Sequence, residues 1–265
     1  MYSIGDDLLK QLGQERCFLA SLRVRYFVEA AFLGTKYVGW QRQPNGLSVQ
    51  EVIESSISTV LRNETQIVGC GRTDAGVHAQ QYFFHFDAEE ELPEGFMFKL
   101  NRFMPDDIAF YDVKLVDDDM HARFSAISRS YKYNLSLRKE PLRQHIAHEY
   151  RYPGELDFDL MNEAGEMLKE RKEFKTFCKK GSDTPHYLCD VTEASWSCNQ
   201  HSATFEISAN RFLRGMVRLI VGMMLQVGRH QLSLAALRQA LDDQVQLKKS
   251  ESAPAHGLHL VEIRY

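Results

Sequence analysis

The sequence contains little cysteine, and the cysteines form no recognisable pattern. Five of them stand among 265 residues, at positions 17, 70, 178, 189 and 198, without a Cys-x-x-Cys pair. An odd and scattered set argues against both a disulfide framework and a zinc ribbon. His186 with Cys189 could begin a metal site, but no matching second pair follows. We therefore expect no bound metal.

Long apolar runs are also missing. The best candidate for a membrane span, residues 17–40, is interrupted by four charged side chains. A spanning helix needs about 20 largely apolar residues. Two aspartates near the N-terminus stand where a secretory signal would be basic. We expect a cytoplasmic protein that does not associate with membranes.

An excess of positive charge is absent overall, since the formal net charge is −4. Its distribution is nevertheless uneven. Residues 121–143 hold six basic side chains against one glutamate, a net charge of +5, and residues 210–230 hold four arginines and no acid. This segregation permits one basic face suited to a polyanion, although charge runs are most often solvated surfaces.

The apolar patterns predict a mixed α+β fold of two similar sheet-and-helix units, 22–117 and 118–265, after an N-terminal extension (1–21). The first unit is expected to contain strands at 22–32, near 68, at 81–86 and at 108–116, with helices from 48 and at 96–103. The second is expected to contain strands at 131–137, 187–197, 203–208 and 258–265, with helices at 157–170, 211–228 and 233–243.

The predicted helix at 211–228 has the clearest two-sided pattern. At about 100° per residue, Arg211, Arg214 and Arg218 fall on the side opposite a continuous apolar face. By periodicity alone, an amphipathic surface helix with solvated arginines is the simpler interpretation. The absence of any acidic partner within the helix favours three guanidinium groups kept for a ligand.

The segment 69–79 reads Gly-Cys-Gly-Arg-Thr-Asp-Ala-Gly-Val-His-Ala and centres on Asp74. Glycines at 71 and 76 permit positive φ and a close approach of substrate, which suits a catalytic loop. The alternative is a polar turn between strands, in which Asp74 bonds its own backbone. The short Gly-Arg-Thr-Asp string alone favours the turn.

Several ordered motifs resemble the tRNA pseudouridine synthase A (TruA) family from about residue 22 to the end of the chain. The segment 71–79 resembles the catalytic loop of that family without a gap, and 34–41 resembles its first loop. Segments 121–126 and 129–133 resemble the part that brings the active-site tyrosine, and 210–222 resembles the part that bears the active-site arginine.

This resemblance implies a pseudouridine synthase fold in which the mixed sheets of two pseudo-symmetric domains join into one central sheet. It further implies a homodimer that converts uridine to pseudouridine at positions 38, 39 and 40 of the tRNA anticodon stem-loop, with no cofactor and no metal. Asp74, Tyr131 and Arg218 are the implied catalytic residues. The implied substrate contacts are Tyr131, Arg72, His78, Gln41, Arg123, Arg211 and Arg214, with a phosphate contact also expected from Arg129.

The chemistry leaves three routes open for Asp74. Its carboxylate could add to C6 of uracil, attack C1′ of the ribose, or take the C2′ proton. Two other interpretations of the chain also remain. A non-catalytic structured-RNA-binding protein would not need Asp74, and a carboxylate hydrolase would need a second carboxylate that this motif lacks.

Overall fold

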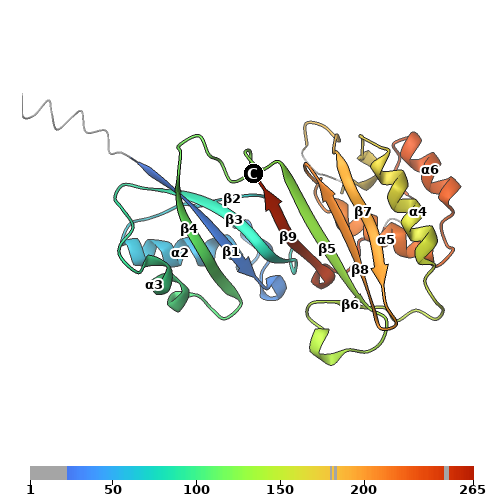
Figure 1. Cartoon of the computed structure of the whole chain (residues 1–265), viewed down its shortest axis with the longest axis horizontal. Coiled ribbons are helices and arrows are strands. Elements are labelled where there is room, and N and C mark those ends of the chain that lie inside the picture. The colour runs from blue at the N-terminus through green and yellow to red at the C-terminus, as the bar shows by residue number, and fades with distance from the viewer. Residues whose placement is uncertain (1–22, 180, 182–183, 248–250) are drawn as a thin grey trace, which may run out of the picture.

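The computed structural model describes residues 23–179, 181, 184–247 and 251–265 (Figure 1). The expected N-terminal extension lies outside them. The first half contains β1 (Val24–Phe32), the 3-10 helix η1 (Gly34–Lys36), α2 (Val49–Leu61), β2 (Val68–Gly69), β3 (His78–Ala88), α3 (Phe96–Phe103) and β4 (Ile108–Val116). The second half contains β5 (Ser128–Ser136), η2 (Pro141–Arg143), β6 (His148–Glu149), α4 (Phe158–Lys169), η3 (Lys175–Phe177), β7 (Val191–Cys198), β8 (Ser202–Ala209), α5 (Met216–Gly228), α6 (Leu234–Asp242), η4 (Ala255–Gly257) and β9 (Leu258–Arg264).

In the first half, β1 lies between β3 and β4 and is antiparallel to both. Alternate residues of β3 face one core, because successive side chains of a strand point to opposite sides. Tyr82, Phe84 and Phe86 are buried in the cluster that also contains the apolar face of α2. Ser48 caps the start of α2, near the predicted helix start, and the hydroxyl of Ser48 accepts a hydrogen bond from the amide of Glu51 at 3.2 Å.

The second half repeats this arrangement. β5 lies between β8 and β9, antiparallel to both, as β1 lies between β3 and β4. In both halves one helix follows the middle strand, α2 in the first and α4 in the second. A further helix precedes the return strand in each half, α3 before β4 and α5 with α6 before β9. The matching order supports the expectation of two similar units.

The two sheets join where β3 and β9 run side by side in the same direction. The parallel pairing is short, with His78 opposite His259 and Ala79 opposite Leu260. The result is a nine-stranded central sheet with the main order β4-β1-β3-β9-β5-β8-β7 (Figure 1). The predicted α+β fold with one joined sheet is therefore confirmed.

Each half has its own hydrophobic core, and the last strand contributes to both. Leu258 of β9 belongs to the core of the second half, whereas Ile263 belongs to that of the first. Tyr131 of β5 packs against both cores. The predicted division between residues 117 and 118 stays a prediction, since Ala122 also packs in the first core.

The prediction of a helix from residue 211 is wrong at its start. α5 begins at Met216, after Gly215 in a left-handed conformation with φ of 70°. The residues before it form a loop, so Arg211 and Arg214 do not share a helix face with Arg218. Apolar periodicity continues through Leu213, which is buried, but the left-handed glycine interrupts the helix.

Within the described ranges, no helix combines the length and the apolar character that crossing a membrane requires.

Candidate active site

The loop between β2 and β3 is held by backbone bonds to the loop after β1. The amide of Trp40 donates to the carbonyl of Thr73 at 3.3 Å, and the amide of Gly76 donates to the carbonyl of Tyr37 at 3.3 Å. Gly39, with φ of 108°, comes so close that an added Cβ would lie 2.4 Å from the oxygen of Thr73. The segment that resembles the first loop of the family thus supports the loop that carries Asp74.

The two glycines that flank Asp74 differ in their backbone conformation. Gly76 has φ of 78°, and an added Cβ would lie 3.3 Å from the Cβ of Ala255. Gly71 is not left-handed, and an added Cβ there would meet nothing nearer than a side-chain atom of Arg129 at 4.0 Å. Only Gly76 therefore has the positive φ that the sequence suggested for both.

Asp74 forms an ion pair with Arg218 across the two halves of the chain. The Nη1 of Arg218 lies 3.0 Å from Oδ2 of Asp74, and the side chains are 21% and 28% exposed. The Nε of Arg218 donates to the carbonyl of Ala253 at 2.7 Å, and the amide of Ala253 donates back to the carbonyl of Arg218 at 2.9 Å. The guanidinium is thus fixed on one side by backbone while it meets the carboxylate on the other.

Tyr131 lies in the middle of β5, between β8 and β9. Its ring is half-buried and meets the ring of Phe212 edge-on, with centroids 5.3 Å apart. Burial raises the pKa of Tyr131, and the charge of the nearby Asp74 carboxylate adds to the effect. The phenol is therefore neutral near pH 7.

Arg129 has a different part from the phosphate contact expected for it. Its Nη2 donates to the carbonyls of Cys70 at 2.9 Å and Arg123 at 2.8 Å, and its Nη1 donates to the carbonyl of Asn210 at 3.0 Å. One guanidinium thus joins the start of the Asp74 loop, the segment before β5 and the loop before α5. The sequence could have indicated this position of Arg129 near the site. Residues two apart in a strand share a face, so Arg129 lies on the same face of β5 as Tyr131.

Three of the expected RNA contacts carry free positive charge. Arg72, Arg123 and Arg214 are exposed, and none forms an ion pair with a residue that the structure describes. Arg211 is instead half-buried, where its Nη1 lies 2.9 Å from the ring nitrogens of His186. Gln41 is exposed beside the supporting loop.

His78 is buried, which contradicts the expectation that it contacts RNA. It is 1% exposed. Its Nδ1 accepts from the amide of Gly34 at 3.0 Å, so its Nε2 carries the proton and donates to the carbonyl of His256 at 3.1 Å. Burial and the neighbouring His259 lower the pKa of His78 to about 4. His78 is therefore a neutral internal support.

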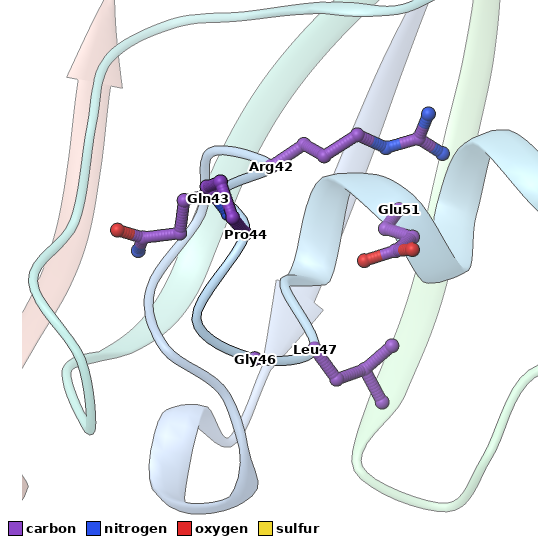
Figure 2. A pocket seen from close by; sticks show the side chains of 6 residues that line it. All are labelled: Arg42, Gln43, Pro44, Gly46, Leu47 and Glu51. Carbon is purple, nitrogen blue, oxygen red and sulfur yellow. The ribbon is translucent and has the colours of Figure 1, made fainter.

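A shallow pocket lies on the loop and helix beyond Gln41 (Figure 2). It is lined by Arg42, Gln43, Pro44, Gly46, Leu47 and Glu51. Arg42 is partly neutralised there, because its Nη2 lies 3.5 Å from Oε2 of Glu54. No Asp74, Tyr131 or Arg218 atom lines this pocket. Among the described residues, no group of three His, Cys, Asp or Glu side chains could hold a metal ion.

Comparison with known proteins gives consistent results over most of the chain. A protein-family model described as tRNA pseudouridine synthase matches residues 29–125 and 169–265. The matched ranges contain the Asp74 loop in the first half and α5 with its Arg218 in the second.

Individual relatives cover nearly the whole chain. A protein of Bacteroides thetaiotaomicron named tRNA pseudouridine synthase A is 43% identical over 245 residues, which are 91% of this chain and 90% of that protein. A protein of the same name from Azobacteroides pseudotrichonymphae is 43% identical over 91% of this chain and 96% of its own length. A third, from Chlamydia trachomatis, is 34% identical over 90% of this chain and 91% of its own length.

Proposed function

The chain belongs to the tRNA pseudouridine synthase family, and on that premise we propose that it isomerises uridine to pseudouridine at positions 38, 39 and 40 of tRNA, in the anticodon stem-loop. The observation that carries the proposal is the 3.0 Å ion pair of Arg218 with Asp74. It brings together the two charged residues that the family motifs single out, although 144 positions separate them in the sequence.

The reaction is an internal rearrangement and its balance is closed. The C1′–N1 glycosidic bond breaks, a C1′–C5 bond forms, the C5 proton leaves and N1 gains a proton. Substrate and product are isomers, so no oxidant or group donor is consumed. The residues at the site need only supply a nucleophile or a proton acceptor, hold the uracil ring and move protons.

Asp74 is the proposed nucleophile or base. Arg218 positions the carboxylate through the 3.0 Å contact of its Nη1 with Oδ2 of Asp74. Addition to C6, attack on C1′ and abstraction of the C2′ proton all use the same carboxylate, so the site is compatible with each route. A uridine within the stem would first turn out of the helix, at a cost of a few kcal/mol.

Tyr131 is proposed to stack on the uracil ring. Its neutral phenol, held by the raised pKa, can donate a hydrogen bond to the base. To accept the C5 proton, the phenol would have to pass its own proton to another acceptor at the same time. Stacking and hydrogen bonding are therefore its first assignment, and proton transfer from C5 the second.

The direct test uses unmodified tRNA carrying tritium at uridine C5. Pseudouridine formation releases that label to water, so we expect release with the wild type and none with Asp74→Ala. A folded wild type that binds tRNA without releasing tritium would refute the proposal in favour of a non-catalytic RNA-binding protein. Cleavage of the glycosidic bond without formation of pseudouridine would favour a hydrolase.

The proposal has two further parts: a homodimer, which rests on the resemblance alone, and a cytoplasmic location, which rests on the sequence pattern. A homodimer is tested by light scattering of the purified chain, and a monomer at micromolar concentration would contradict it. A cytoplasmic location is tested by cell fractionation.

A further inference from the structure

The segment before β5 exposes two large apolar side chains on a well-anchored backbone. Phe124 is 75% exposed and Ile127 is 67% exposed. Ala122, just before them in the chain, is fully buried in the first core. Its carbonyl accepts a hydrogen bond from the hydroxyl of Tyr265 at 2.7 Å. The amide of Ala122 donates to Nδ1 of His85 at 3.1 Å. The two exposed side chains are thus not on a loose loop.

Local bonds fix the position of Phe124 itself. The Nδ1 of His121 accepts from the amides of Arg123 and Phe124 at 3.0 and 3.2 Å. The imidazole ring of His121 lies against the Phe124 ring, with centroids 4.4 Å apart, and the guanidinium carbon of Arg123 lies 5.4 Å from its centre. The Phe124 ring is therefore held in one position although it is exposed.

This segment adjoins the candidate active site. The Nη2 of Arg129 donates to the carbonyls of both Arg123 and Cys70, so one side-chain nitrogen links the segment of Phe124 to the start of the Asp74 loop. Asp74 lies four residues beyond Cys70, which is at most about 14 Å of extended chain. Arg129 thus ties the segment that carries Phe124 to the loop that carries Asp74.

The charge of the surroundings selects a polyanion. Residues 121–129 contain two arginines and no acid. The side chains of Arg72 and Arg123 are exposed and unpaired within the described part of the chain. Aromatic rings beside free cations are the arrangement by which proteins hold unpaired nucleotides, through stacking on bases and contact with phosphates.

We infer that Phe124 stacks on an unpaired base of the anticodon loop next to the target uridine, while Arg123 contacts the adjoining phosphate. The occupant follows from the proposed function, because tRNA is the substrate. Neither the family motif nor the Asp74–Arg218 pair assigns a part to the Phe124 ring. Stacking on an aromatic ring contributes about 1–3 kcal/mol per base, which corresponds to a five- to 150-fold change in affinity.

The chain offers a matched control on the far side of the first half. Phe98 of α3 is 68% exposed and also has an arginine over its ring, with the guanidinium carbon of Arg102 at 5.8 Å. We expect Phe124→Ala to weaken binding of the full chain to unmodified tRNA by about five-fold or more. Phe98→Ala should stay within two-fold of wild type, and Phe124→Trp should restore affinity.

Salt dependence separates stacking from phosphate contact. Phe124→Ala should leave the slope of log Kd against log salt unchanged, whereas Arg123→Gln should reduce it by about one. Quenching of the new indole in Phe124→Trp by tRNA, but not in Phe98→Trp, would report the stacked base directly. Both native tryptophans are buried and give a constant background.

Two outcomes would overturn the inference. One is an affinity of Phe124→Ala that matches Phe98→Ala. The other is a loss of self-association in Phe124→Ala, measured by light scattering without RNA, together with unchanged tRNA affinity per chain; the ring would then contact a second copy. Tritium release by wild type is measured separately, so a binding-only protein would refute the proposed activity while the affinity ratio still decides the role of Phe124.

Discussion

Arg218→Lys tests whether Arg218 positions the proposed catalytic carboxylate, Asp74, or contacts RNA. Arg218 makes two bonds with different atoms of one planar group, to Asp74 at 3.0 Å and to the carbonyl of Ala253 at 2.7 Å. A lysine ammonium keeps the charge but lacks the rigid fork that reaches both. The substitution therefore removes one anchored bond and leaves Asp74 with a mobile partner.

The size of the effect follows from the bond that is lost. A hydrogen bond to or from a charged group contributes about 1.5–3 kcal/mol, which converts to about a 10- to 150-fold decrease in kcat if the loss is felt in the transition state. The lost bond also contributes to stability. We therefore expect the free energy of unfolding to fall by no more than about 3 kcal/mol, and the midpoint of thermal unfolding by no more than about 12 °C.

The assay is single-turnover tritium release at saturating tRNA, with Kd measured separately. Arg238→Lys is the matched control, because Arg238 of α6 is exposed, has no ion pair among the described residues and has no part in the proposed site. It should retain kcat within two-fold. If Arg218→Lys instead raised Kd and left kcat intact, Arg218 would be an RNA contact and the role assigned to it would be wrong.

Substitutions of Arg129, Gly76 and His78 test the supports of the site, with Gly71→Ala as a control. Arg129→Gln should lower the free energy of unfolding by about 1–3 kcal/mol in urea titrations, because three backbone carbonyls lose a charged donor, and it should also slow tritium release. Gly76→Ala should cost about 1–2 kcal/mol in the same titrations through its positive φ, whereas Gly71→Ala should change stability by less than about 0.5 kcal/mol. His78 has a folded pKa of about 4 against an ordinary 6.5, so its unfolded form binds the proton first and the stability it contributes is complete above pH 6.5 and is lost as the pH falls toward 4. Urea titrations from pH 7.5 to 4.5 should show a shallower loss for His78→Gln than for wild type, and equal slopes would contradict the assignment.

Local patterns predicted much of the fold, because strand alternation and the Ser48 cap are decided by neighbouring residues. The start of α5 was not predictable in this way. Its apolar period continues through residues 211–215, and only the left-handed φ of Gly215, set by the path of the chain, ends it there. The roles of charged and polar residues were harder to predict than the strands and helices. Arginine and histidine are residue types that often contact RNA. In the tertiary fold, however, Arg129 donates to backbone carbonyls and His78 is buried.

The buried position of His78 explains how two halves joined by so short a strand pairing hold one ion pair. From Asp74 the chain runs four residues to His78, whose Nε2 donates to the carbonyl of His256. Three residues before His256, the backbone of Ala253 exchanges hydrogen bonds with Arg218, which returns to Asp74 through the ion pair. These bonds form a closed loop through β3 of the first half and through η4 and α5 of the second half. A shift of one half against the other would strain these bonds, so the geometry of the Asp74–Arg218 pair depends on the buried imidazole of His78, which the resemblance implied as a substrate contact.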